Sequence, residues 1–223
     1  MLHSLRHLAP ALTLATALAA ATTGAQADVV QLNDFSIAGP SGLNVVAQHI
    51  GASWYGAAGQ FSGQLNGNSF VTYCVDLPQY ADFGVSYSNY QRVDGVSAFG
   101  AEKAEDLSRL ISYVGMTPQW STDSAMVQAA VWEVVHETGR NYSFTSGDVL
   151  ASGLDSSTQD WLNAFDWAAM KATSPTWQIG ALTNPDHQDF LVAQPIPEPS
   201  TYALMALGIG LVAYTARRRA AKA

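Results

Sequence analysis

Residues 68–77 have the sequence Asn68-Ser69-Phe70-Val71-Thr72-Tyr73-Cys74-Val75-Asp76-Leu77 and hold the only cysteine of the chain. The β-branched and aromatic residues of this stretch predict a strand over Phe70–Val75. The preceding segment, Gln60–Leu65, alternates polar and apolar side chains. Asn66-Gly67 lies between the two segments and is typical of a two-residue hairpin turn, because Asn and Gly tolerate positive φ. The sequence therefore predicts a β-hairpin whose second strand carries Cys74.

The rest of the body, residues 28–194, divides into a β-rich first half and a helical region. Further predicted strands are Val29–Leu32, Tyr87–Val93, Thr176–Ile179 and Asp189–Val192. Apolar residues at helical spacing predict helices at Glu102–Val114, from Ser121 through His136, and at Ser156–Ala172. We predict an α+β fold in which a β-sandwich or barrel-like layer carries an inserted or appended helical subdomain.

The N-terminal residues have the three parts of a secretory signal peptide. Arg6 supplies the basic start, Leu8–Ala21 is an apolar run, and Ala25-Gln26-Ala27 is a small-residue cleavage site. The apolar run is shorter than the roughly 20 residues that span a bilayer, which disfavours a permanent anchor. We expect residues 1–27 to be removed on export.

The C-terminal residues also form a three-part segment. Pro197-Glu198-Pro199 is followed by the apolar segment Thr201–Ala216 and then by Arg217-Arg218-Arg219. This tail resembles the PEP-CTERM sorting signal of Gram-negative bacteria. The resemblance implies that an exosortase recognises residues 195–223 as a transient inner-membrane anchor, a short transmembrane helix, then cleaves it and passes the protein outward. We expect the protein at the cell surface or in the extracellular matrix.

Charge excludes one class of partner. The chain has a formal net charge of −8, and its basic residues between the two ends are few and scattered. They are Arg92, Lys103, Arg109, Arg140 and Lys171. Binding to nucleic acid through phosphates needs clustered Lys and Arg, so no nucleic-acid partner is expected.

A lone cysteine in an exported protein has no partner for an internal disulfide. Such a cysteine suggests an intermolecular disulfide or a chemically reactive thiol. The alternative is a buried, inert thiol that packs as a small apolar side chain. Gln128 lies within the second predicted helix. A thiolate held against a glutamine carboxamide displaces ammonia and forms a thioester, provided that rigid elements position both groups and exclude water. Trp132 lies one helical turn after Gln128, where its ring can cover the carboxamide, and Tyr73 flanks Cys74.

Two motifs strengthen this pairing. Tyr73-Cys74-Val75-Asp76 resembles the aromatic-Cys-hydrophobic motif of bacterial thioester domains, which occur on surface adhesins. Val127–Trp132 is similar to their Gln-x-Ala-Ile-Trp helix motif, with Val131 in place of Ile. The resemblance implies an internal Cys74–Gln128 thioester that captures a Lys amine or a glycan hydroxyl once, without a cofactor and without enzymatic turnover.

Three other interpretations remain open from the sequence. Cys74 can be an inert core residue of a non-covalent structural or glycan-binding matrix protein. Cys74 and His136 can form a cysteine hydrolase pair, with Asp76 or Asn141 as the orienting group. His49, His136 and His187 are metal-ligand types, although no pair has a typical ligand spacing. Most of the tryptophans are expected in the core rather than in a glycan groove.

Overall fold

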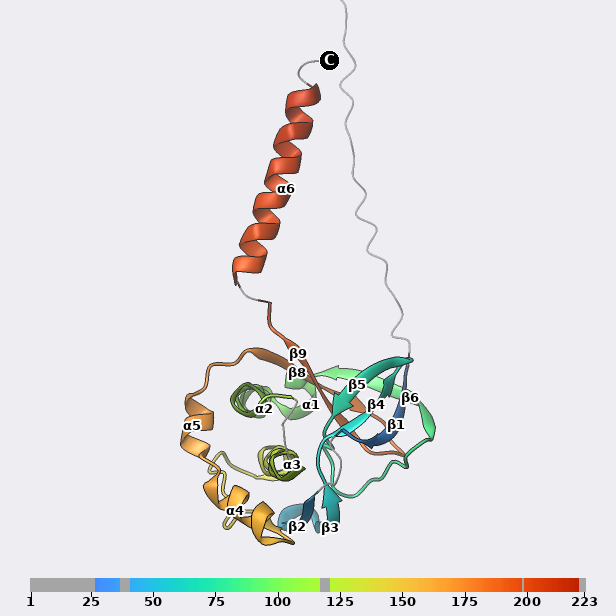
Figure 1. Ribbon diagram of the computed structural model, residues 1–223, viewed down its shortest axis with the longest axis vertical. Coiled ribbons are helices and arrows are strands. Elements are labelled where there is room, and N and C mark those ends of the chain that lie inside the picture. The colour runs from blue at the N-terminus through green and yellow to red at the C-terminus, as the bar shows by residue number, and fades with distance from the viewer. Residues whose placement is uncertain (1–26, 37–40, 117–120, 198, 221–223) are drawn as a thin grey trace, which may run out of the picture.

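The computed structural model describes residues 27–36, 41–116, 121–197 and 199–220 (Figure 1). The predicted signal peptide falls almost wholly in residues 1–26, outside these ranges, and Glu198 of the sorting motif lies outside them as well. Figure 1 shows a curved sheet on one side of the molecule and the helices of the body on the other. The α+β prediction is confirmed.

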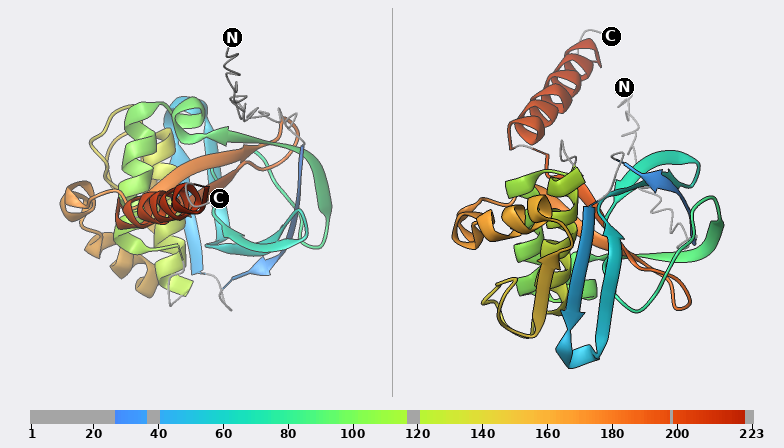
Figure 2. Two further views of the ribbon diagram at one scale, coloured as in Figure 1. Left: turned by 90° about the horizontal axis from the view of Figure 1, so that it is seen from above. Right: turned by 60° about the horizontal axis from the view of Figure 1, so that its bottom comes forward.

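The larger sheet nearly closes into a barrel. Its strands are β1 (Asp28–Phe35), β4 (Phe61–Leu65), β5 (Asn68–Thr72), β6 (Ser86–Asp94), β8 (Trp177–Thr183) and β9 (Phe190–Pro195). They are antiparallel throughout, in the order β5-β4-β1-β6-β8-β9. After β5 the chain pairs with the beginning of β9, where the Leu191 N–H donates to the Tyr73 carbonyl at 2.9 Å. This contact joins the two edges of the sheet, and the ring is visible from above in Figure 2.

The β4–β5 hairpin forms as the sequence predicts. Leu65 pairs with Asn68, and the two turn residues between them have φ values of 53° at Asn66 and 79° at Gly67. The predicted bounds of the second strand need a correction, however, because β5 ends at Thr72. Cys74 lies two residues beyond β5 and forms an isolated antiparallel bridge with Phe190. The cysteine is therefore held by a pairing partner far away in the sequence rather than by its own hairpin.

A smaller sheet is made of β2 (Ser41–Ala47), β3 (Ala52–Ala58) and β7 (Val149–Gly153), with β2 in the centre. A short 3-10 helix, η1 (Gln48–Ile50), joins β2 to β3. Alternate residues of β2, namely Leu43, Val45 and Ala47, are buried, as expected for a strand with one face on the core. Strand β7 lies where the sequence pattern does not indicate a strand. The right-hand view of Figure 2 shows this sheet in front of the helices.

The helices of the body are α1 (Gly95–Phe99), α2 (Ala101–Val114), α3 (Ser121–His136), α4 (Ser156–Ala164) and α5 (Trp167–Ala172). The predicted second helix is confirmed as α3, and the first as α2, which ends before Gly115. The predicted single helix over residues 156–172 is wrong, because it is interrupted at Phe165 and Asp166. The Asp166 side chain accepts a hydrogen bond from the Ala169 N–H at 2.9 Å and so caps a new helix.

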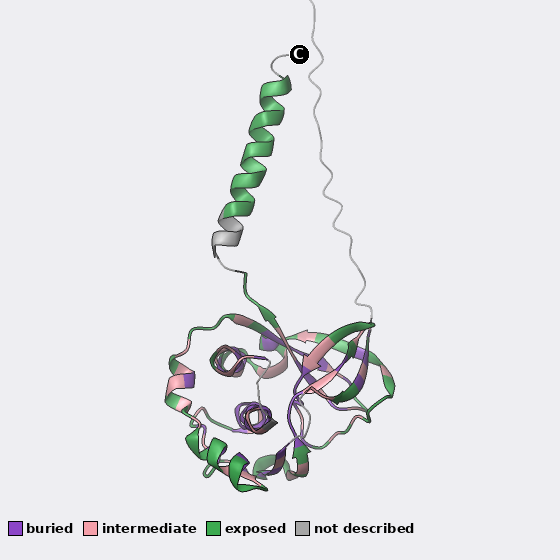
Figure 3. Cartoon of the chain, viewed as in Figure 1, coloured by how far each residue is buried: buried purple, intermediate pink, exposed green. Residues whose placement is uncertain are grey.

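The core is centred on α3. Its residues Val127, Ala129, Ala130, Val131 and Val134 are fully buried, and α3 packs against β2 on one side and α2 on another. Figure 3 shows the buried residues gathered along α3 and the inner faces of the strands. A helix that is apolar on nearly all sides belongs in the interior. Gln128 is therefore a polar residue in an apolar environment.

The tail forms α6 (Pro199–Ala220), which extends away from the body (Figure 1). Its side chains from residue 204 to residue 220 are exposed. Among the residues that the structure describes, no helix is both long and apolar enough to cross a membrane, so the transmembrane helix predicted for this tail is not confirmed.

Candidate functional site

Cys74 and Gln128 are in direct contact. The Cys74 backbone N–H donates a hydrogen bond to Gln128 Oε1 at 2.9 Å, and Gln128 Nε2 donates to the Cys74 carbonyl at 2.9 Å. The carboxamide of Gln128 thus pairs with the peptide group of Cys74 as a neighbouring strand would. Both residues are almost inaccessible, with exposed fractions of 8% for Cys74 and 1% for Gln128. The two residues that the sequence paired are brought together in the interior.

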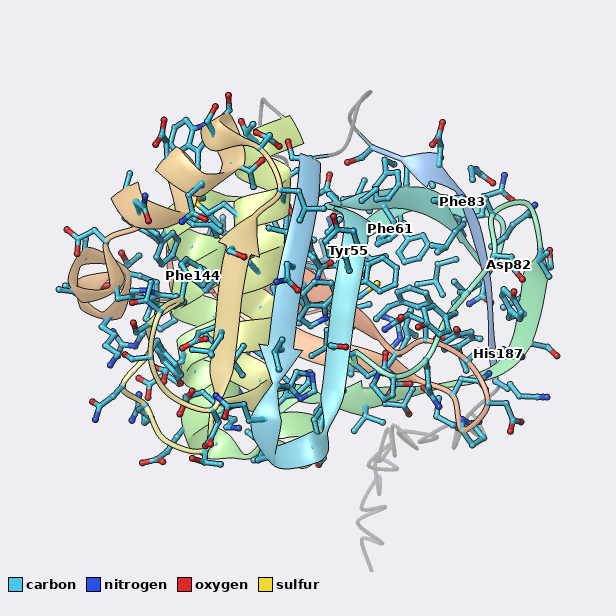
Figure 4. All side chains as sticks on the ribbon, turned by 90° about the horizontal axis from the view of Figure 1, so that it is seen from below. Tyr55, Phe61, Asp82, Phe83, Phe144 and His187 are labelled. Atoms are coloured by element: carbon cyan, nitrogen blue, oxygen red, sulfur yellow. The ribbon has the colours of Figure 1, made fainter. Side chains whose placement is uncertain are left out.

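A pocket of about 260 Å³ opens onto this pair. Its polar lining residues are Cys74, Asp76, Gln128 and Gln188. Its aromatic lining residues are Phe35, Trp54, Phe61, Tyr80, Phe83 and Trp132. Some of these rings are partly exposed, as with Tyr80 at 63%. Phe61 and Phe83, whose ring centroids are 5.8 Å apart, lie together on the barrel side of the small sheet in Figure 4. The pocket therefore joins the outside to the Cys74–Gln128 pair through aromatic walls.

Trp132 is held as part of this wall. Its Nε1 donates to the Asp76 carbonyl at 3.2 Å, and its ring lies 6.3 Å from that of Trp54, centroid to centroid. Trp54 in turn lies 5.9 Å from Tyr80. Within the described ranges, the buried Trp54 Nε1 has no hydrogen-bond partner. Tyr73, the other predicted shielding residue, is fully buried but does not line the pocket.

The surroundings of the site raise the pKa values of the Cys74 thiol and the Asp76 carboxyl. Burial raises the pKa of the Cys74 thiol well above its ordinary value; the charge of Asp76 adds to this effect, and Gln188 opposes it. Burial and the nearby charge of Asp189 raise the pKa of Asp76 to about 7. Deprotonation of the thiol in this pocket consequently needs a local proton acceptor.

His136 does not join this site. Its Nε2 lies 2.9 Å from the Val75 carbonyl, and His136 is not among the residues that line the pocket. Burial lowers the pKa of His136 to about 4, so the ring is neutral at physiological pH. Asn141, a candidate orienting group, is exposed and is also absent from the pocket lining. The contacts of His136 are those of a structural residue at the end of α3.

The other candidates from the sequence are dispersed. Among the described residues, no group of three or more His, Cys, Asp or Glu side chains is arranged to hold a metal ion. His187 packs on Tyr87, with ring centroids 4.2 Å apart. Of the tryptophans that the structure describes, Trp54 and Trp132 line the pocket.

Three residues of the site had no recognisable signal in the sequence. Trp54 comes from β3, Tyr80 from the connection before β6, and Gln188 from the turn before β9. They meet at the pocket only because the barrel closes next to the small sheet. A pattern within one element cannot identify them.

Comparisons with known proteins give one partial match to a solved structure and one to a sequence family. The chain is similar to the N-terminal thioester domain of a surface protein from Clostridium perfringens, in a cysteine-to-alanine mutant, with a TM-score of 0.43 and 14% identity over 69% of this chain and 99% of that one. No curated protein matched the sequence. The PEP-CTERM protein-sorting motif matches residues 195–219, and Pro199 of this motif is the first residue of α6. The chain is therefore an exported protein that carries a PEP-CTERM sorting motif, the signal that directs exosortase processing and delivery to the cell surface or beyond.

Proposed function

We propose that Cys74 and Gln128 form an internal thioester, with which the exported protein captures a nucleophile covalently. The observation that supports this function best is the double hydrogen bond between the Gln128 carboxamide and the Cys74 peptide group, in a water-poor interior. It holds the acyl carbon of Gln128 beside the residue that carries the sulfur. Fixed geometry of this kind replaces a bimolecular encounter by an intramolecular one.

Bond formation needs only groups that are present. The Cys74 thiol loses its proton, and the thiolate attacks Cδ of Gln128. Negative charge then develops on Oε1, where the Cys74 backbone N–H already donates at 2.9 Å, so this N–H stabilises the tetrahedral intermediate as an oxyanion-hole donor. The C–N bond breaks, ammonia leaves with one added proton, and the carbonyl carbon remains bonded to sulfur.

Capture of a nucleophile breaks the C–S bond that the first reaction forms. A nucleophile enters between the aromatic walls and attacks the same carbonyl carbon, the C–S bond breaks, and Cys74 returns to the thiol. An amine leaves an amide on Gln128, and a hydroxyl leaves an ester. Because Gln128 is consumed, each molecule reacts once, and no cofactor is involved. A Lys side chain and a glycan hydroxyl of a neighbouring surface or matrix component are the proposed targets.

The test is the intact mass of the exported body, residues 28–197, under native conditions. We expect a mass one ammonia below that of the sequence, and a gain of one methylamine after incubation with that amine. Cys74→Ala and Gln128→Ala each remove the deficit. Gln178→Ala, a change at an exposed glutamine of β8, keeps it. Full sequence mass together with a Cys74 thiol that iodoacetamide alkylates readily contradicts the proposal.

A further inference from the structure

We propose that Asp76 is the proton acceptor and donor for the reactions of Cys74 and Gln128. This inference rests on the proposed thioester function and assigns its proton transfers to a named side chain.

The placement of Asp76 follows from extended backbone. Residues i and i+2 of an extended segment lie on the same face, and Cys74 and Asp76 both line the pocket with Gln128, whereas Tyr73 and Val75 do not. Trp132 Nε1 at 3.2 Å and Gln188 Nε2 at 2.9 Å hold the Asp76 carbonyl. Two elements beside the pocket thus fix the backbone of Asp76.

The carboxylate is held at one oxygen only. Asp76 Oδ1 accepts hydrogen bonds from Gln188 Nε2 and from the Asp189 backbone N–H. In the part of the chain that the structure describes, Oδ2 has neither a hydrogen bond nor a cationic partner. An anchored carboxylate with one unoccupied oxygen is suited to exchanging a proton with groups in the pocket.

The groups around Asp76 tune its protonation. Asp189, before β9, contributes a negative charge; Tyr90 from β6 and Cys74 from its own segment are neutral neighbours whose pKa values are raised. His136, at the end of α3, is neutral at physiological pH. With a pKa of about 7, Asp76 is close to the value at which a general base is most effective at neutral pH.

The proton transfers balance without an outside reagent. During formation, Asp76 takes the proton of the Cys74 thiol and returns it to Nε2 of Gln128 as ammonia departs. During capture, Asp76 takes a proton from the attacking amine or hydroxyl and returns it to the sulfur as the C–S bond breaks. This second transfer matters because the buried Cys74 thiolate is a poor leaving group, as its raised pKa indicates.

The experiment compares rates of methylamine capture by wild type and by Asp76→Asn, counting by mass only molecules that carry the thioester. The ratio of the two rates at each pH cancels the titration of methylamine itself. We expect a ratio near 1 at pH 5 that rises through a midpoint near pH 7 to about 10²-fold at pH 8 and above. Asp76→Glu, which keeps a carboxylate, restores a large part of the rate.

Two further variants separate a chemical role from a structural one. Asp189→Asn removes the neighbouring charge and should shift the midpoint of the wild-type profile to lower pH, because an isolated carboxylate ionises more easily. Asp186→Asn, an exposed change in the same turn, should leave the profile in place. If Asp76→Asn folds but stays at full mass, recovery of the mass deficit in Asp76→Glu supports the role, and failure to recover it overturns the role.

The outcomes keep the two proposals apart. A rate ratio near 1 at every pH, with thioester present in the wild type, overturns the role of Asp76 and leaves the thioester intact. A wild-type protein at full sequence mass contradicts the proposed function itself.

Discussion

At the scale of single residues, Gln128 has a structural role besides its proposed chemical one. Its carboxamide is a buried polar group, which is tolerated in an apolar helix because both of its polar atoms are paired. The same pairing satisfies the N–H and the carbonyl of Cys74. The proposed chemistry and the stability of the fold therefore involve the same two hydrogen bonds, and mutations can separate the two effects.

We predict that Gln128→Ala is less stable than Cys74→Ala by about 1–3 kcal/mol, although neither variant can form the thioester. Cys74→Ala keeps the backbone groups that Gln128 binds, whereas Gln128→Ala leaves a buried N–H and carbonyl without that partner. Urea unfolding of both variants measures the difference. Equal stability would mean that these hydrogen bonds contribute nothing to the fold.

Glu133 is a buried acidic residue whose protonation affects the stability of the fold. It is fully buried; Oε1 accepts the Ser143 N–H at 2.7 Å, and in the described part of the chain Oε2 has no partner. Burial, with a smaller contribution from Glu137, raises the pKa of Glu133 to about 8. The folded state therefore holds this proton more tightly than the unfolded state, and its stabilising effect is lost as pH rises from about 4 to 8.

Glu133→Gln removes this loss of stability with rising pH, because glutamine does not titrate. We expect its stability relative to wild type to improve by up to about 3 kcal/mol between pH 4.5 and pH 7.5, measured as the free energy of unfolding in urea at each pH. Glu102→Gln, an exposed change on α2, serves as the control and should show little pH-dependent difference. A constant difference for Glu133→Gln would mean that Glu133 is already ionised in the folded protein.

The sequence singled out Cys74 and Gln128, which the structure places in contact, but it did not identify the residues around them. Cys74 was conspicuous as a lone thiol, and Gln128 through the resemblance of Val127–Trp132 to the helix motif of thioester domains. Gln188 and Trp54 meet them through strand pairing between distant segments, for example the bridge of Cys74 to Phe190. Such pairings depend on tertiary packing, which local patterns do not encode.

At the scale of elements, strong local signals predicted structure well. Asn66-Gly67 gave the hairpin turn, and helical spacing gave α2 and α3. The break between α4 and α5 was missed because the helical spacing of apolar residues continues across it. The side chain of Asp166 caps the N-terminus of α5 and so favours a second, separate helix. The strand β7 was missed because five residues rich in small side chains have little intrinsic preference.

The α4–α5 break can be tested through its cap. Asp166→Ala removes the acceptor of the Ala169 N–H and should destabilise the protein by about 1 kcal/mol. Asp160→Ala, at an exposed position inside α4, should change stability by much less. Thermal and urea unfolding of the two variants provide the comparison, and equal effects would contradict a capping role for Asp166.

At the scale of the whole molecule, the body and the tail are energetically separate. The described side chains of α6 after residue 203 are exposed, whereas the core of the body is complete once β9 has joined the sheet. The last strand of the body, β9, ends at Pro195. Release of the tail by an exosortase would thus leave the core unchanged.

We therefore predict that a chain ending at Pro197 has a melting temperature within about 2 °C of the longer chain, because no core side chain is removed. A chain ending at Asp189, which lacks β9, should fail to fold, since it loses Phe190 and Leu191 from the core and opens the barrel. Circular dichroism on heating distinguishes them. A large drop for the first truncation would show that α6 stabilises the body.

The exit of α6 directly after β9 has a mechanical consequence. Six residue pairs join β9 to β8, and the beginning of β9 also pairs with the segment around Cys74. A pull on the tail along the axis of β9 loads these hydrogen bonds together, in shear, instead of opening them one after another. Traction on the tail is thus transmitted through one strand to the segment that contains Cys74, so the hydrogen bonds that resist the pull lie next to this residue.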